Sequence, residues 1–80
     1  MSFQEKKTAI EIFVIDRARE MRMKKNMSQV ELGNVLGISS GFIGNVESPN
    51  HPAKYNLNHI NQLAEIFECS PKDFLPQENL

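Results

Sequence analysis

The chain has 80 residues, of which 40% are hydrophobic and 24% charged, with a formal net charge of −1. This length supports one modest core and is too short for two folds, so we expect a single domain over residues 1–80. No apolar run approaches the roughly 20 residues of a membrane span, and the single cysteine, Cys69, excludes an intramolecular disulfide and a cysteine-rich metal site.

The first residues do not read as a secretion signal. The apolar run after Lys6 and Lys7 is interrupted by Glu11 and Asp16, and no small-residue cleavage site follows it. Together with the lone thiol, this leads us to expect a cytoplasmic protein that contacts no membrane.

Charge is distributed unevenly along the chain. Residues 1–27 contain seven basic and four acidic residues, a net charge of +3, whereas residues 28–80 contain two basic and six acidic residues, a net charge of −4. The overall balance argues against a nucleic-acid binder, which is usually basic. The basic first third fits a phosphate-facing side and equally a solvated helix.

The first predicted helix runs from Thr8 to about Lys25, with a strand over the run IEIFVI as the alternative. Its apolar residues recur at intervals of four, four and three, the period of one helical face. They are Ile10, Val14, Ala18 and Met21.

Two start sites for this helix fit the capping box, in which Ser or Thr is followed three residues later by Glu. They are Thr8 with Glu11 and Ser2 with Glu5, and we favour Thr8. In that case residues 1–8 form an N-terminal extension.

The second and third predicted helices are short. Ser28, with Glu31 three residues later, opens a helix through Leu36, and Gly37 ends it because glycine enters the left-handed region without a Cβ clash. The third helix starts at Ser39 or Ser40 and runs to about Glu47, where the loop SPNHPAKYN with its two prolines stops it.

A fourth amphipathic helix is predicted from residue 56 or 58 to 67. Ser70 and the proline after it then indicate a last short helix that ends before Pro76, leaving a tail at residues 76–80. The expected fold class is therefore all-α, a compact bundle of five helices.

The most informative segment is QVELGNVLGISSGFIGNVES. Counting Gln29 as its first position, the small residue Gly33 is fifth, the turn residue Gly37 is ninth, and apolar residues fall fourth, eighth, tenth, fifteenth and eighteenth. These are the positions that two helices bury when they cross steeply over a short turn. The pattern predicts a helix-turn-helix over about residues 28–47. The apolar positions are Leu32, Leu36, Ile38, Ile43 and Val46.

The chain resembles the lambda-repressor-like (XRE-type, Cro/C1-type) helix-turn-helix family over roughly residues 14–75. The matching residues are Arg22 in helix one, Ser28 and Gln29 at the start of helix two, Glu47 at the end of helix three, and Leu63 and Ala64 in helix four. The resemblance implies a five-helix bundle, a DNA-binding transcription regulator, and an internal Arg22–Glu47 ion pair that orients the bundle.

In such a domain the third helix lies in the major groove while the start of the second meets the DNA backbone. Gln29 is the predicted phosphate clamp, with an ordinary exposed position at the helix start as the alternative. Asn45 is the best candidate base reader, because a carboxamide pairs with adenine N6 and N7. The predicted outward face of the third helix comprises Ser39, Ser40, Gly41, Gly44 and Asn45.

This recognition helix departs from the usual pattern. Gly41 and Gly44 each sacrifice about 1 kcal/mol of helix propensity. Close approach to the groove, close packing against another helix, and a weak helix ordered on binding all remain open as reasons. The face also lacks Arg and Lys, so it cannot make the bidentate contact to guanine.

The loop after Glu47 is about two residues longer than the family's usual connection. Its last residues, Lys54, Tyr55 and Asn56, are expected to touch the sugar-phosphate backbone, with packing of the Tyr55 ring beneath the loop as the alternative. His51, His59 and Cys69 are not spaced as a metal site, so we expect neither a metal nor a cofactor.

No catalytic constellation is present in the sequence, and we do not expect an enzyme. The preferred function is a transcription regulator that binds double-stranded DNA as a homodimer, because one helix-turn-helix reads only a half-site. The alternative is a protein-interaction or antitoxin-like module, supported by the near-neutral charge. The candidate dimer surfaces are the segments Phe3–Phe13 and Phe74–Leu75.

Overall fold

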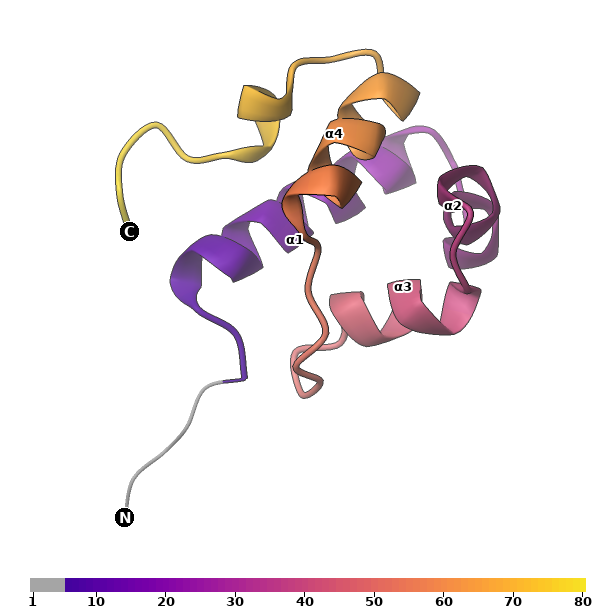
Figure 1. The fold of residues 1–80 in the computed structure, drawn as a ribbon, viewed down its shortest axis with the longest axis horizontal. Helices are drawn as coiled ribbons and strands as arrows, with labels where there is room; N and C mark the ends of the chain where they lie inside the picture. Colours follow the sequence, from indigo (N-terminus) through magenta and orange to yellow (C-terminus); the bar gives the residue numbers. More distant parts are fainter. Residues whose placement is uncertain (1–5) are drawn as a thin grey trace.

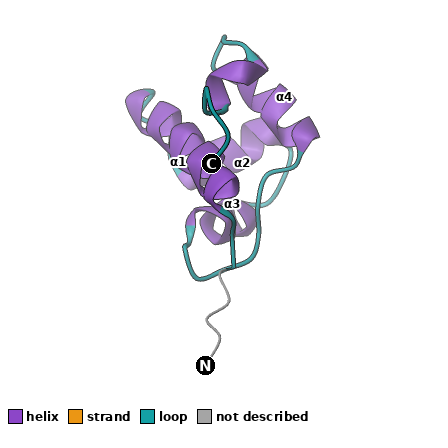
Figure 2. Cartoon of the chain, turned by 90° about the vertical axis from the view of Figure 1, so that its left-hand side faces the viewer, coloured by secondary structure: helices purple, strands orange, loops and turns teal. Residues whose placement is uncertain are grey.

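The computed structural model describes residues 6–80, which form four α-helices and one 3-10 helix (Figure 1). No strand occurs among these residues (Figure 2), as the sequence predicts. The elements in chain order are α1 Ala9–Lys24, α2 Gln29–Leu36, α3 Ser40–Glu47, α4 Leu57–Ile66 and the 3-10 helix η1 Pro71–Phe74. No helix in this part of the chain is both long and apolar enough to cross a membrane.

The fifth predicted helix is the 3-10 helix η1 rather than an α-helix, so the described residues form four α-helices where a bundle of five was expected. Asp73 N donates to Ser70 O at 2.9 Å and Leu75 N donates to Lys72 O at 3.0 Å, which are three-residue spacings. The segment between the Ser70 cap and the extended residue Leu75 is only four residues long, too short to establish the four-residue repeat. Packing of Phe74, which is fully buried, holds this turn.

Local capping sets the boundaries of the first two helices. Thr8 Oγ1 accepts from Glu11 N at 3.4 Å and Glu11 Oε1 accepts from Thr8 N at 2.8 Å, so the favoured start of α1 is confirmed. Ser28 and Glu31 form the same reciprocal pair at the start of α2. Gly37 follows α2 with a φ of 74°, the left-handed conformation that the sequence predicts there. The alternative start at Ser2 and Glu5 lies outside the described residues.

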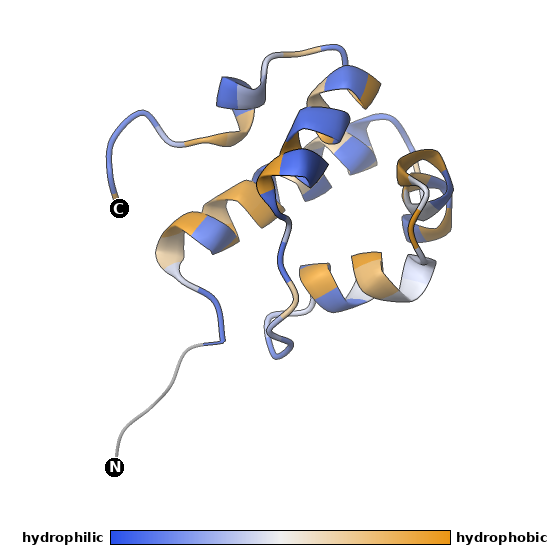
Figure 3. Ribbon diagram, viewed as in Figure 1, coloured by the Kyte–Doolittle hydropathy of each residue, from blue (hydrophilic) through white to orange (hydrophobic). Residues whose placement is uncertain are grey.

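The core lies between α1, the α2–α3 pair and α4. The buried face of α1 differs from the predicted one by a rotation: Val14, Ile15 and Ala18 are buried, whereas Ile10 is 45% exposed. Figure 3 shows apolar colouring in the first half of α1, and Ile10 in this part lines an open hollow beside Leu75. The remaining buried hydrophobic residues are Leu32, Leu36, Ile43, Val46, Tyr55, Ile60, Leu63, Ala64, Phe67 and Phe74.

The close crossing of α2 and α3 depends on Gly33. A Cβ at this position would lie 2.9 Å from Ile38 O and 3.1 Å from Ser40 N, and both are backbone atoms of the turn. Because backbone atoms cannot rotate away as a side chain does, only glycine lets the two helices approach this closely.

We expect Gly33→Ala to lower the free energy of unfolding by about 1–3 kcal/mol, because the added methyl group overpacks the turn. Urea denaturation followed by circular dichroism measures this change. Asn34→Ala, at the exposed neighbouring position of α2, is the matched control and should change stability by less than about 0.5 kcal/mol. Equal stabilities of the two variants would contradict this account of the crossing.

Candidate nucleic-acid interface

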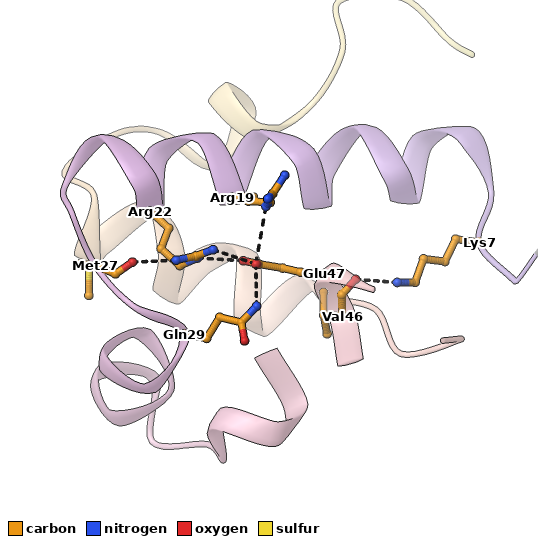
Figure 4. A network of polar contacts seen from close by, with 7 residues as sticks. All are labelled: Lys7, Arg19, Arg22, Met27, Gln29, Val46 and Glu47. Atoms are coloured by element: carbon orange, nitrogen blue, oxygen red, sulfur yellow. Dashed lines mark hydrogen bonds and ion pairs between the residues drawn. The ribbon is translucent and has the colours of Figure 1, made fainter. Parts of the chain in front are cut away.

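A buried ion pair joins α1 to the end of α3 (Figure 4). Arg22 donates from Nε and Nη2 to the two carboxylate oxygens of Glu47 at 2.9 and 2.8 Å, and its Nη1 donates to Met27 O at 2.6 Å. The two side chains are only 10% and 5% exposed. The ion pair expected from the sequence is therefore present, and it also fastens the connection between α1 and α2.

Gln29 joins the same carboxylate. Its Nε2 donates to Glu47 Oε1 at 3.0 Å, and Arg19 Nε lies 3.8 Å from that oxygen on a side chain that is 55% exposed. Neither interpretation of Gln29 anticipated this contact, which depends on how α2 and α3 cross. An amide nitrogen carries two hydrogens, so one remains after the bond to Glu47.

The two glycines of α3 have different environments. An ideal Cβ on Gly44 would lie 3.3 Å from Gln29 Oε1, so Gly44 accommodates the Gln29 side chain. Close packing against another helix therefore accounts for Gly44. A Cβ on Gly41 would meet only Ser39 Oγ, at 3.9 Å, so packing within the chain does not require glycine there.

The outward face of α3 is small and uncharged. Ser40, Gly41 and Asn45 are exposed, whereas Gly44 is partly covered. Ser39 caps the helix, because its Oγ accepts from Phe42 N at 3.1 Å. Ser39 is exposed as well, so four of the five predicted contact residues are open to solvent, three of them within α3 and Ser39 at its N-cap.

Two residues of the α3–α4 loop bind within the chain. Lys54 Nζ pairs with Glu11 Oε2 at 2.8 Å, and this hydrogen bond is the main cause of the lowered pKa of the Glu11 carboxyl group. Asn56 caps α4, because its Oδ1 accepts from His59 N at 2.8 Å. These contacts fasten the long loop to the start of α1 and to α4.

Tyr55 packs beneath the loop, as the alternative interpretation of this residue expects. It is 8% exposed, and its ring meets Phe42 and His59 edge-on at centroid distances of 6.5 and 5.9 Å. Its hydroxyl group is buried without a hydrogen-bond partner, and burial raises its pKa. A phosphate cannot reach this group unless the loop moves.

Sequence reasoning missed Lys7. Its Nζ donates to Ser48 O at 2.6 Å, to Asn45 O at 3.4 Å and to Val46 O, all at the end of α3. The side chain is 5% exposed, and burial is the main cause of its lowered pKa. The signal that could have suggested such a cap is the lack of a glycine or a basic residue at the end of α3.

The two histidines and the cysteine each have their own local contacts and do not form a cluster. His51 Nδ1 accepts from Ala53 N at 3.0 Å, and His59 Nδ1 accepts from Asn56 N at 3.1 Å. Cys69 packs half-buried against the core, and burial raises the pKa of its thiol. Within residues 6–80 no three His, Cys, Asp or Glu side chains are grouped as metal ligands would be.

The arrangement of the helices matches a solved structure, the restriction-modification controller protein C.AhdI from Aeromonas hydrophila. The TM-score is 0.68 at 26% sequence identity, and the match covers 80% of this chain and 94% of that one. No protein-family model matches the sequence, and no curated protein matches it.

We expect Glu47→Ala to lower the free energy of unfolding by about 3–5 kcal/mol, because the Arg22 guanidinium loses its partner in a buried site. The control is Glu20→Ala, which removes an equally short ion pair, 2.7 Å to Arg17, that is 35% and 61% exposed. That change should cost less than about 1 kcal/mol. Denaturant unfolding of both variants makes the comparison, and similar losses would show that burial does not set the strength of the Glu47 network.

Proposed function

We propose that this chain, a helix-turn-helix protein of the lambda-repressor-like (XRE-type) family, is a transcription regulator that reads a specific DNA sequence with α3 in the major groove. The supporting observation is the open face of Ser40, Gly41 and Asn45. It adjoins the start of α2, because Gly44 of the same helix lies against the Gln29 side chain. The fold shared with a restriction-modification controller supports the same function.

The start of α2 supplies the proposed grip on the DNA backbone. The N–H groups of Gln29 and Val30 precede the first hydrogen bond of the helix, from Leu32 N to Ser28 O at 3.0 Å. Such N–H groups and the positive end of the helix dipole attract a phosphate. The second amide hydrogen of Gln29 adds a donor, and the exposed Arg19 adds a cation near it.

The proposed base contacts come from α3. Asn45 accepts from N6 and donates to N7 of an adenine, and Ser40 donates to or accepts from a base or a phosphate. Packing within the chain does not require glycine at Gly41. Its role in the proposal is to let the backbone approach the groove floor. We assign Lys54 to a supporting position for the loop, where its ammonium pairs with Glu11 and neutralises that carboxylate.

We also propose a homodimer, because a palindromic site requires two reading helices. The two candidate surfaces adjoin, since Ile10 and Leu75 line one apolar hollow beside Val14 and Ile60. Ile10 and Leu75 are 45% and 44% exposed. The part of the Phe3–Phe13 surface that precedes residue 6 lies outside the described residues.

The proposal is tested by duplex binding at several salt concentrations, after a site has been selected from a random pool. We expect two chains per site and an affinity that falls steeply with salt, because phosphate contacts release counterions. Absence of binding to any duplex at about 50 mM salt, or an affinity that hardly changes with salt, would favour the protein-interaction module instead.

Two substitutions separate the assigned roles in the same assay. Asn45→Ala should relax the preference at one base pair by about 1–3 kcal/mol, whereas Gln29→Ala should weaken all sequences about equally. Asn61→Ala, at an exposed position of α4, is the matched control and should change neither. Equal effects of Asn45→Ala and Gln29→Ala on every sequence would refute the assignment.

Gly41→Ala tests why α3 has a glycine that packing within the chain does not require. We expect it to raise the free energy of unfolding by about 0.5–1 kcal/mol, because alanine favours the helix and its Cβ meets nothing closer than 3.9 Å. It should nevertheless weaken DNA binding, since the methyl group holds the backbone away from the groove. Denaturation and duplex titration measure the two effects. Tighter binding together with higher stability would instead show that Gly41 only destabilises the helix and does not serve DNA binding.

A further inference from the structure

The end of α3 has neither a following glycine nor a basic residue of its own to bind its last carbonyl groups. The last carbonyls of a helix have no partners within the helix, and a following glycine or a nearby cation commonly supplies them. Here Ser48 follows in an extended conformation, with φ −83° and ψ 124°, and Pro49 comes next. The last turn of α3 contains no basic residue. The backbone itself supplies two contacts, from Ser48 N to Asn45 O at 3.2 Å and from His51 N to Ser48 O at 3.3 Å. The carbonyl group of Val46 is bound from elsewhere in the chain.

Lys7 supplies this contact, and it lies 38 to 41 positions earlier in the sequence than the carbonyl groups it binds. Its ammonium group has three hydrogens, and the carbonyl oxygens of Asn45, Val46 and Ser48 provide three acceptors. A positive charge at this end of a helix is also favoured by the helix dipole. Figure 4 shows Lys7 reaching the Val46 carbonyl from the start of α1.

The position of Lys7 is fixed by its own neighbours. Thr8, the next residue, is the N-cap of α1 and shares a capping box with Glu11. Glu11 in turn pairs with Lys54 at 2.8 Å, which holds the α3–α4 loop against the start of α1. The lysine is thus presented from a rigid helix start to the end of the recognition helix.

We propose that Lys7 is a positioning residue for base reading, which sets the orientation of Asn45 by holding the carbonyl groups of the last turn of α3. This inference rests on the proposed DNA-binding function. Because Asn45 O is itself an acceptor, the backbone from which the reading side chain projects is held directly. Lys7 does not act as a phosphate contact, since it is 5% exposed and its three donors are used within the chain.

Lys7→Met tests the proposal, because methionine keeps an unbranched chain of similar length and removes the charge and the donors. Lys6→Met is the matched control at the exposed neighbouring position. We expect Lys7→Met to reduce the preference for the selected site over a site altered at the Asn45 base pair by about tenfold. The slope of affinity against salt should stay unchanged, because no phosphate contact is lost.

A measurement without DNA separates this inference from the proposed function. Amide hydrogen exchange should quicken over residues 45–48 in Lys7→Met and stay unchanged in Lys6→Met. If the parent protein binds no duplex while exchange responds as expected, the proposed function fails and Lys7 remains only a helix cap, which overturns its role in reading.

Three results would overturn the inference while leaving DNA binding intact. They are unchanged site preference in Lys7→Met, a salt slope lower by about one counterion, and an equal loss of preference in Lys6→Met. If Lys7→Met fails to fold, Lys7→Gln, which keeps an uncharged donor, is compared in the same assays. Its site preference should fall less than tenfold and its exchange should quicken over the same residues; an unchanged preference would again overturn the inference.

Discussion

One buried carboxylate, that of Glu47, determines how the parts of the helix-turn-helix are held together. A charge with 5% exposure is stable only when its oxygens are fully paired, and Arg22 from α1 and Gln29 from α2 donate to it. Its position therefore fixes three helices relative to one another. It also turns the Gln29 side chain over Gly44, which explains why a helix that gains nothing from glycine has one there.

Helix α3 is intrinsically weak, and contacts from the rest of the chain compensate for this. Ser39 caps its start, Gly33 admits its first turn close to α2, and Lys7 binds the carbonyls at its end. An eight-residue helix with two glycines would not persist alone in water. Because contacts from other parts of the chain stabilise α3, the side chains on its outer face need not stabilise the fold. Small uncharged side chains can therefore occupy this face.

Those parts of the structure that depend on short stretches of sequence could be predicted. The capping pairs of α1 and α2 act over three residues, and the Gly37 turn is equally local, so their patterns sufficed. The contacts of Gln29 and Lys7 span 18 and up to 41 positions, and no local pattern encodes them. The predicted burial of Ile10 failed, and the sequence left the placement of Tyr55 open, for a related reason. Periodicity and position in a loop do not say how far neighbouring elements extend over a side chain.

The formal net charge of −1 is only weak evidence against DNA binding. Several acidic residues have partners within the chain: Glu31 accepts from Ser28 N at the start of α2, Asp73 accepts from Ser70 N at the start of η1, and Glu47 pairs with Arg22. Such carboxylates are compensated by helix N-termini or by adjacent guanidinium groups, so their field at a distance is reduced. Because Arg22 already neutralises Glu47, the 55% exposed Arg19, 3.8 Å from the same carboxylate, leaves a net positive charge beside the start of α2. Which charges remain uncompensated, and on which face they lie, matters more for a phosphate backbone than their sum.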